Sequence, residues 1–285
     1  MTIKEALTTL PQYTLPHHAL SRLMSILTHC ENKRWKNLFI KQIIRHYRVN
    51  MAEALETDIE AYASFNAFFT RALKPGARPI TRDPDAIASP ADGIVSQAGS
   101  IEKGRIFQAK GKSFSTAELL GDSQRAALFD AGAFTTIYLS PKDYHRLHMP
   151  LTGTLTEMVH IPGRLFSVNN ATTNCVPGLF ARNERVAALF DTEAGPMALV
   201  LVGAIFVSSI ETVWHGVVTP PTIKNVRSWR YDTAAPHLQT GEEMGRFNMG
   251  STIIVLFGKD RTAWADSLKA GNPVKLGQKI GSIRA

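Results

Sequence analysis

Cysteine is scarce in this chain of 285 residues: Cys30 and Cys175 are the only two. They lie far apart and form no Cys-x-x-Cys pair, so the sequence predicts no structural metal site and two thiols in a reducing compartment. The first residues lack the basic stretch followed by an apolar stretch that marks a secretory signal peptide, and we expect none.

A long apolar run is also missing. The uncharged stretch from Ala194 to Ile210 contains Gly195, Pro196 and Gly203 and is rich in valine and isoleucine. A membrane-spanning helix needs about 20 predominantly apolar residues. The stretch therefore predicts a buried strand, and we expect no transmembrane helix.

Several motifs that define common protein classes are absent. We find no zinc-finger spacing, no RNP-type aromatic signature and no long run of lysine and arginine, so nucleic acid is not expected as a partner. A phosphate-cradling glycine loop and a βαβ rhythm are missing too, which argues against Rossmann and P-loop enzymes. The net charge is nevertheless +8, which favours an anionic partner such as an acidic ligand or an anionic membrane surface.

The first 75 residues are predicted to be helical. Two stretches repeat apolar residues at helical spacing: Leu20, Leu23, Met24 and Leu27, then Trp35, Leu38, Phe39 and Ile43. Basic residues occupy much of the rest of the second stretch: Lys33, Arg34, Lys36, Lys41, Arg45 and Arg48. A basic amphipathic helix with tryptophan and phenylalanine is typical of proteins that lie on membranes. A helix that packs on its own domain has the same pattern.

The pattern of apolar and polar residues changes after Lys74-Pro75-Gly76, which ends the helical part. From Pro79 onward, short apolar runs alternate with glycine, proline, asparagine and aspartate. This pattern predicts many short strands. The predicted fold class is thus α+β: a helical, membrane-associating region at residues 1–75, followed by a β-rich catalytic domain of mostly antiparallel strands at residues 76–285.

Two patches in the β-rich part carry residues suited to proton transfer. Asp92 precedes a glycine in "SPADG", a pair that most often marks a turn. His145 and His148 lie three apart in "DYHRLHMP". A third ligand in a recognisable motif is missing, so the histidines do not predict a metal site. A general-base role is open to them, because histidine exchanges protons near neutral pH.

A third patch is the Gly250-Ser251 step in "NMGSTIIVLF". The start of a strand is the simple interpretation. A serine hydroxyl can also attack the carbonyl of its own preceding peptide bond when a base takes its proton. Asp92, His148 and Ser251 would supply an aspartate–histidine–serine set for that reaction, but such sets are recognised by geometry and not by sequence position.

Together these patches resemble the phosphatidylserine decarboxylases of the bacterial and mitochondrial type. The resemblance covers nearly the whole chain, including "FNAFFTRALKPGARPI", "SPADG", "QAKGKSFS", "DYHRLHMP", "IPGRLFSVN", "LFARNERV", "DTEAGPMALVLVGAIFVSSIETVW" and "EMGRFNMGSTIIVLF". Members of this family are made as one inactive chain and cut themselves before the serine of a Leu-Gly-Ser-Thr motif. The present chain has methionine for the leucine, at Met249, an apolar swap of similar volume.

The resemblance implies that Asp92, His148 and Ser251 form the self-processing triad. The cut between Gly250 and Ser251 would leave a large β chain, residues 1–250, and a small α chain, residues 251–285. Ser251 would become a covalent pyruvoyl group, the cofactor of the reaction. This ketone would condense with the amine of phosphatidylserine and act as the electron sink while the carboxylate leaves as carbon dioxide.

The resemblance further implies the partners and the location. The product is phosphatidylethanolamine, so the pathway is phospholipid biosynthesis, and the enzyme works at an anionic membrane surface as a peripheral protein on the cytoplasmic face of the inner membrane. The β and α chains would form a heterodimer, and a homodimer of these is left open. His145 is a candidate proton donor or substrate contact, and Ser167 a candidate substrate contact.

Two other functions fit parts of the sequence. A serine hydrolase that acts on lipid esters would keep Ser251 as a hydroxyl, but the chain lacks the Gly-x-Ser-x-Gly elbow of such enzymes. A non-catalytic membrane-binding module would use only the basic helices and leaves the polar patches of the β-rich part unexplained.

Overall fold

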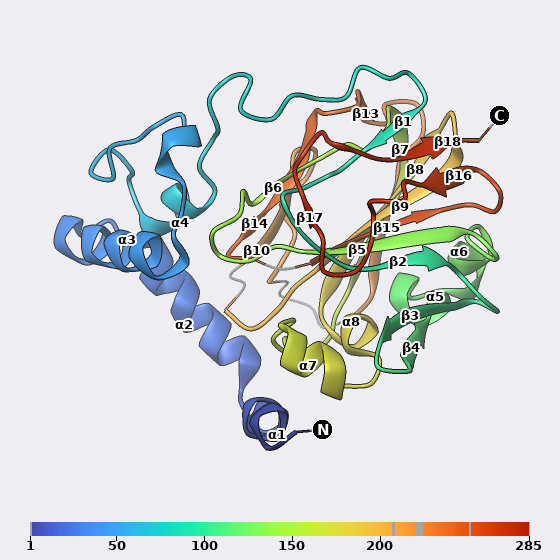
Figure 1. Cartoon of the computed structure of the whole chain (residues 1–285). Coiled ribbons are helices and arrows are strands. Elements are labelled where there is room, and N and C mark those ends of the chain that lie inside the picture. The colour runs from blue at the N-terminus through green and yellow to red at the C-terminus, as the bar shows by residue number, and fades with distance from the viewer. Residues whose placement is uncertain (1, 207–208, 221–224, 251, 285) are drawn as a thin grey trace.

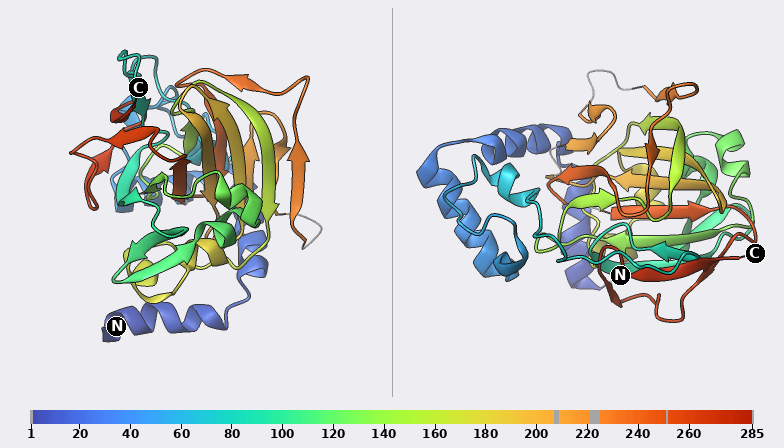
Figure 2. Two further views of the ribbon diagram at one scale, coloured as in Figure 1. Left: turned by 90° about the vertical axis from the view of Figure 1, so that its right-hand side faces the viewer. Right: turned by 90° about the horizontal axis from the view of Figure 1, so that it is seen from above.

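The computed structural model describes residues 2–206, 209–220, 225–250 and 252–284. Its first helices precede all of its strands in the chain, as the colour gradient of Figure 1 shows. Seen from above in Figure 2, the N-terminal helices lie beside a body of β-sheet. The predicted α+β architecture, with N-terminal helices before mostly antiparallel strands, is confirmed.

Local sequence signals set the ends of the N-terminal helices. The Thr2 hydroxyl and the Glu5 side chain each accept a hydrogen bond from the other residue's backbone N–H, which forms a capping box. Asn32 caps the third helix, and Arg48 ends it at a φ of 55°. The elements are α1 (Ile3–Thr9), η1 (Leu10–Tyr13), α2 (His17–His29), α3 (Lys33–Tyr47), η2 (Met51–Glu53) and α4 (Phe65–Phe69).

These helices enclose a core of their own, which we call the helical core. The indole N–H of Trp35 donates to the carbonyl of Leu27 at 2.9 Å and so joins α3 to α2. Phe39 of α3 stacks on Phe65 of α4 with ring centroids 4.2 Å apart. The buried side chains of the helical core are Ile40, Val49, Tyr62, Phe65, Phe68 and Phe69.

Within the described residues, nine antiparallel strands form the large sheet at the centre of the body. Their order is β12-β7-β8-β9-β15-β5-β2-β17, with β13 paired to β7. The bounds are β2 (Gly93–Ser100), β5 (Ala133–Tyr138), β7 (Gly153–Ile161), β8 (Arg185–Thr192), β9 (Gly195–Val202), β12 (Arg227–Arg230), β13 (His237–Leu238), β15 (Thr252–Phe257) and β17 (Pro273–Val274). Strand β9 is the buried strand predicted in the stretch from Ala194 to Ile210.

Both faces of the large sheet are covered, which explains its continuous apolar strands. In β15, Ile253 and Val255 point into one buried cluster, while Ile254 and Leu256 point into another. This alternation is the period of two expected for side chains of a strand. Four short helices contribute to the second cluster or lie beside it: α5 (Thr116–Leu120), α6 (Ser123–Ala127), α7 (Asn170–Cys175) and α8 (Leu179–Arg182).

Smaller sheets complete the body. The small sheet, in the order β11-β10-β14-β6, consists of β6 (Arg146–His148), β10 (Ser209–Thr212), β11 (Gly216–Val217) and β14 (Glu243–Asn248). A third sheet, β1-β18-β16, joins β1 (Ala86–Ala88), β16 (Thr262–Trp264) and β18 (Lys279–Ile283). A hairpin pairs β3 (Arg105–Ala109) with β4 (Lys112–Ser115).

The C-terminal segment contributes strands to the large sheet and to the third sheet. Strand β15 lies between β9 and β5 and is paired along its whole length on both sides. Strand β17 pairs with β2, and β18 pairs with β1. Residues 252–284 therefore supply a middle strand of the large sheet, β15, and its edge strand, β17. Across the described residues, the helices are all too short or too polar to cross a membrane.

Replacing Ile254 by alanine should lower the free energy of unfolding by about 2–5 kcal/mol, because the side chain is fully buried and its removal leaves a cavity. The valine variant should lose about 0.5–1.5 kcal/mol. Ile26→Ala is the control, since Ile26 is 70% exposed on α2. Denaturant unfolding measures all three, and an equal loss for Ile26→Ala and Ile254→Ala would contradict the position of β15 in the core.

Candidate active site

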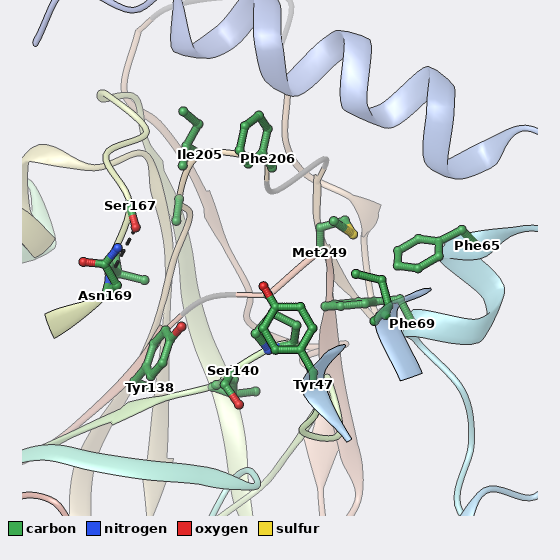
Figure 3. Close-up of a pocket in the computed structure, with 16 residues that line it drawn as sticks. Tyr47, Phe65, Phe69, Tyr138, Ser140, Ser167, Asn169, Ile205, Phe206 and Met249 are labelled. Carbon is green, nitrogen blue, oxygen red and sulfur yellow. Dashed lines mark hydrogen bonds between the residues drawn. The ribbon is translucent and has the colours of Figure 1, made fainter. Parts of the chain in front are cut away.

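A pocket of about 440 Å³ opens where the helices meet the large sheet. Ile43 and Tyr47 of α3, together with Phe65 and Phe69 of α4, form one wall. The opposite wall comes from the β body, and Figure 3 shows Tyr138, Ser140, Ser167 and Asn169 there. Gly250 lines the pocket as well. The predicted cleavage position thus lies beside a cavity that both parts of the chain build.

The chain makes a short crossing at this point. Strand β14 ends at Asn248 in the small sheet, and β15 begins at Thr252 in the large sheet. Only residues 249–251 connect them, and each residue of an extended chain spans at most about 3.6 Å. Ser251 itself lies outside the described residues. Met249 has a φ of 88°, in the left-handed region that costs a residue with a side chain about 1–3 kcal/mol.

His145 lies against Gly250. A Cβ atom built on Gly250 would lie 2.7 Å from His145 Nε2, so only glycine fits at this position. The Nδ1–H of His145 donates to the carbonyl of Asp143 at 2.8 Å, and its buried Nε2 has no hydrogen-bond partner among the described residues. Burial lowers the pKa of His145 to about 3. The imidazole is therefore neutral above that pH, with a lone pair on Nε2 that faces the predicted cleavage site and has no partner in the described part of the chain.

His148 is the last residue of β6 and is partly buried. Its Nδ1–H donates to the carbonyl of Gly241 at 2.8 Å, which leaves Nε2 as the acceptor for the hydroxyl of Tyr144 at 3.3 Å. Burial lowers the pKa of His148, although the Gly241 carbonyl and the charges of Glu243 and Asp92 oppose that shift. His148 is thus a neutral base held in one tautomer.

Asp92 is a buried carboxylate in an ion-pair network. It accepts hydrogen bonds from Arg78 Nε at 2.8 Å, from Lys275 Nζ at 3.2 Å and from the backbone N–H of Leu276 at 2.9 Å. Arg78 also binds Glu53 at 2.7 Å. Burial raises the pKa of Asp92, but the hydrogen bonds from Arg78 and Leu276 and the charges of Arg78 and Lys275 outweigh it, so the pKa lies below its usual range.

The structure brings only part of the predicted set together. His145 and Gly250 are in contact range, whereas the described hydrogen bonds of Asp92 go to Arg78, Lys275 and Leu276 and not to His148. Asp92 acts on His148 through its charge, which raises the proton affinity of the imidazole. Ser167 lines the same pocket as Gly250. Its backbone N–H donates to Gln12 of η1 at 2.8 Å.

Arg78 and Lys275 were not anticipated as site residues. They reach Asp92 from 14 and 183 positions away along the chain. Arg78 stands in "KPGARPI", a quoted part of the resemblance, and that was the one signal available in the sequence. Across the described residues, no group of three or more histidine, cysteine, aspartate or glutamate side chains is placed to hold a metal ion.

Comparison with known proteins assigns the chain to a family. The family model described as phosphatidylserine decarboxylase matches residues 65–282, and a second model, described as PSD, matches residues 7–48. The chain belongs to the phosphatidylserine decarboxylase family. The expected resemblance is therefore confirmed, and the matched residues include every predicted site position from Asp92 to Ser251.

Relatives in this family match the chain over almost its whole length. A protein of Pseudomonas fluorescens is 59% identical over 99% of this chain and 100% of its own length. One of Pseudomonas putida is 61% identical over 98% of both chains, and one of Stutzerimonas stutzeri is 59% identical over 98% of this chain and 95% of its own. Each is named phosphatidylserine decarboxylase proenzyme. The serine-hydrolase and non-catalytic alternatives are not favoured.

Arg78→Gln should destabilise the protein by about 3–5 kcal/mol at pH 7, because it leaves the buried Asp92 carboxylate short of its closest partner. The matched control is Lys279→Gln, which breaks a half-exposed pair with Asp83 and should cost at most about 1 kcal/mol. Unfolding curves at pH 7 measure both changes. Equal losses would contradict the role given to burial.

The same variants give a pH dependence. The pKa of Asp92 is lowered in the folded protein, so its contribution to stability is present above the unfolded value of about 4 and is lost as pH falls through the folded value. Without Arg78 the folded pKa of Asp92 rises, so Asp92 contributes less stability at pH 7 and the variant should lose less stability than the wild type as the pH falls. Unfolding midpoints between pH 7 and pH 3 should show this flatter pH profile much more strongly in Arg78→Gln than in Lys279→Gln, whose partner Asp83 is half-exposed.

Proposed function

We propose that the chain is a proenzyme that cuts its own Gly250–Ser251 bond and then decarboxylates phosphatidylserine to phosphatidylethanolamine. Membership of the family supports the reaction, and the relatives are named proenzymes. The observation that carries the location of the site is the neutral Nε2 of His145, which lies against Gly250 and has no hydrogen-bond partner among the described residues. A neutral imidazole, a glycine and a pocket meet at this point of the fold.

Self-cleavage needs a nucleophile, a base and a group that tunes the base. In the proposed reaction the Ser251 hydroxyl adds to the Gly250 carbonyl carbon while His148 takes the hydroxyl proton, and the buried charge of Asp92 strengthens His148 as a base. The histidine returns the proton to the leaving nitrogen, the C–N bond breaks, and an ester remains. Elimination releases the Gly250 carboxylate, and hydrolysis with loss of ammonia converts the former serine into a ketone.

The residues around Gly250 fit a small, planar ketone group. Gly250 leaves no room for a side chain beside His145 and the Leu139 carbonyl, and His145 Nε2 is a buried nitrogen without a hydrogen-bond partner among the described residues. Ser167 and Tyr138 line the same pocket. The pyruvoyl group formed from Ser251 would supply the electron sink for loss of carbon dioxide. His145 is the proposed proton donor or carboxylate contact, a role that requires its Nε2 first to take up a proton in the course of the reaction, and Ser167 is a proposed substrate contact.

The pocket also favours decarboxylation through its polarity. Its 16 described lining residues include no lysine, arginine, aspartate or glutamate. A carboxylate that enters an apolar, uncharged site loses its hydration without gaining a counter-ion. Conversion to carbon dioxide removes that charge, so the environment destabilises the substrate carboxylate more than the product.

The two chains of the cut protein are proposed to stay together as a heterodimer. Strand β15 would belong to the small chain, and its neighbours β9 and β5 to the large one. The small chain also contributes β17 and β18, which pair with β2 and β1. Lys275 of the small chain binds Asp92 of the large one. Backbone pairing, core burial and an ion pair thus all bridge the two chains.

The helical region is the proposed membrane-docking element. Trp35 and Leu38 of α3 are 37% and 55% exposed, and Leu23 and Ile26 of α2 are 54% and 70% exposed. Lys33, Arg34, Lys41 and Arg45 are exposed too. Apolar side chains next to basic ones suit the interface of an anionic bilayer, where each basic residue contributes about 1 kcal/mol. Because α3 also lines the pocket, docking would bring the lipid head group to the site.

Lys36 is an exception on this surface. It was expected among the basic residues of the amphipathic helix, but only 2% of it is exposed. Its ammonium group donates to the Asn37 side chain at 2.7 Å and to the Glu60 carbonyl at 3.1 Å. Lys36 therefore holds α3 to the segment before α4 and is no part of the proposed docking face.

We propose a peripheral location on the cytoplasmic face of the inner membrane, where phosphatidylserine is the substrate.

The two histidines should separate by stage. His148→Ala should accumulate uncut chain, with cleavage slowed by about 10²–10⁴-fold, the usual effect of losing a general base. His145→Ala should still cut, at least in part, but release carbon dioxide poorly. Gels of freshly synthesised protein measure the first effect, and carbon dioxide release from phosphatidylserine measures the second.

Two controls frame this test. Ser251→Ala should give neither cleavage nor carbon dioxide, because no hydroxyl remains to attack Gly250. His237→Ala should behave as wild type, since His237 is an exposed histidine that binds only Thr154 among the described contacts. A reversed pattern for His145 and His148 would exchange their roles, which the contact of His145 with Gly250 would then explain. Two chains with normal activity from Ser251→Ala would refute the pyruvoyl assignment.

Replacing Lys33, Arg34 and Lys41 together by glutamine should weaken binding to phosphatidylserine vesicles by about 3 kcal/mol at low salt, or roughly 100-fold. The difference should shrink as salt rises, because the electrostatic part of the binding is screened. Co-sedimentation with vesicles across a salt series measures the effect.

The control changes the same number of charges elsewhere, at Lys103, Lys259 and Lys269, which are exposed on the β body. Lys36 stays unchanged in both variants, because its loss would disturb the packing of α3. Equal binding by the two triple variants would exclude this face of α3 as the docking surface.

A further inference from the structure

We propose that the helical core holds Met249 in its left-handed conformation and thereby keeps the backbone that leads to the bond to be cut under strain. Met249 is, in this proposal, a positioning residue for self-cleavage: it acts on the Gly250–Ser251 bond through the backbone and does not touch the reacting atoms with its side chain. The inference rests on the proposed cut at that bond. It gives the N-terminal helices a task in maturation, in addition to the membrane docking proposed for them.

The backbone of Met249 supplies the first observation. Its φ of 88° lies where side-chain-bearing residues are rarely found, because the Cβ atom comes too close to the backbone. Glycine would adopt this conformation without that penalty, yet the chain has methionine here. Such a conformation persists only where the surroundings impose it, and it clusters at functional sites.

The anchors on both sides of Met249 supply the second observation. On the N-terminal side, the Asn248 amide donates to Ser209 Oγ at 2.6 Å, and its carbonyl oxygen accepts from Asn66 of α4 at 3.1 Å. On the C-terminal side, Thr252 is registered between Tyr138 and Val202 in the large sheet. The connection of three residues between these anchors leaves little freedom to relax.

The side chain of Met249 supplies the third observation. It packs against the helical core, and Figure 3 shows it beside Phe65, on the helical wall of the pocket. Relaxation of φ to an ordinary value would have to move this side chain out of its packed position or shift α4. The packing therefore opposes the change that would relieve the strain, as a close-packed core resists displacement.

The strain favours cleavage because it is lost when the chain is cut. While residues 248 and 252 are joined, the backbone of Met249 cannot relax; once the C–N bond after Gly250 is broken, it can. His145 Nε2 against Gly250 closes the remaining side, so the glycine cannot swing toward the histidine. The precursor is raised in free energy relative to its product, and part of that difference lowers the barrier to attack on the Gly250 carbonyl.

Three substitutions at Met249 separate strain from packing. Met249→Leu keeps both the Cβ atom and the apolar volume and should cut at the wild-type rate. Met249→Ala keeps the Cβ atom but loses the packing and should cut more slowly. Met249→Gly loses both and should be slowest, by about tenfold, the ratio expected from relief of such a strain. The rates come from gels of protein made in a cell-free pulse.

Matched controls test each cause alone. Met51→Ala removes a methionine that packs on the same helical core but does not line the pocket, and should cut normally. Lys103→Gly relieves a left-handed residue that does not line the pocket either, at a φ of 51°, and should also cut normally. Thermal unfolding in a Ser251→Ala background gives the stability of each uncut chain. Met249→Gly should unfold at the same or a higher temperature than its parent.

The outcomes are decisive. Cleavage of Met249→Gly as fast as wild type, or as fast as Met249→Ala, would overturn the strain proposal. So would slow cleavage that goes with a lower unfolding temperature, because it would report damage to the fold. The mass of the small fragment tests the underlying cut separately: a fragment that does not begin at residue 251 refutes the proposed cleavage site, whereas correct fragments at equal rates refute only the role of Met249.

Discussion

The passage of the chain from the small sheet to the large sheet in three residues is the constraint on which the site depends. Both sheets are fixed by their own pairing, so the segment from Met249 to Ser251 has to fit the gap between them. Gly250 is the residue that this gap admits beside His145, and the pocket opens at the same point. The helices complete the arrangement from the other side, where the ring centroids of Phe69 and His145 lie 4.0 Å apart. The placement of the base, the peptide bond and the cavity follows from one short connection between two rigid elements.

Burial divides the electrostatics of this region into two kinds of group. The histidines lose proton affinity because the hydrogen bonds and charges near them offset only part of the loss of water, and they stay neutral. Asp92 keeps its charge because Arg78 and Lys275 surround it, and Arg78 extends the network to Glu53 in the helical region. One carboxylate is thus fixed as an anion while nearby imidazoles are fixed as bases. Pairs of groups whose environments push their pKa values apart are typical of catalytic sites.

Periodicity and motifs predicted the order of helices and strands, the buried strand in the stretch from Ala194 to Ile210 and the family. They did not predict which basic residues of α3 are exposed. Lys36 fits the helical pattern of its neighbours, but in the folded chain it is buried and donates to the carbonyls of Ile59 and Glu60, more than 20 positions away. The Arg78–Asp92–Lys275 network was out of reach for a similar reason, since ion pairs between distant segments leave no local periodic trace. The contact of His145 with Gly250 depends on how two sheets are set against each other, which no single stretch of sequence records. The triad itself stays a prediction, because Ser251 lies outside the described residues.

The position of β15 also bears on how the protein withstands unfolding after maturation. In the uncut chain, the strand that fills the middle of the large sheet is tethered, so its return on refolding is an intramolecular event with a high effective concentration. With the proposed cut at Gly250–Ser251, the same strand would belong to a separate peptide of 35 residues, which could diffuse away from an opened sheet. Unfolding of the cut protein would then be a dissociation whose reversal depends on protein concentration. The precursor folds as one molecule, whereas the stability of the cut protein would depend on retention of its central strand.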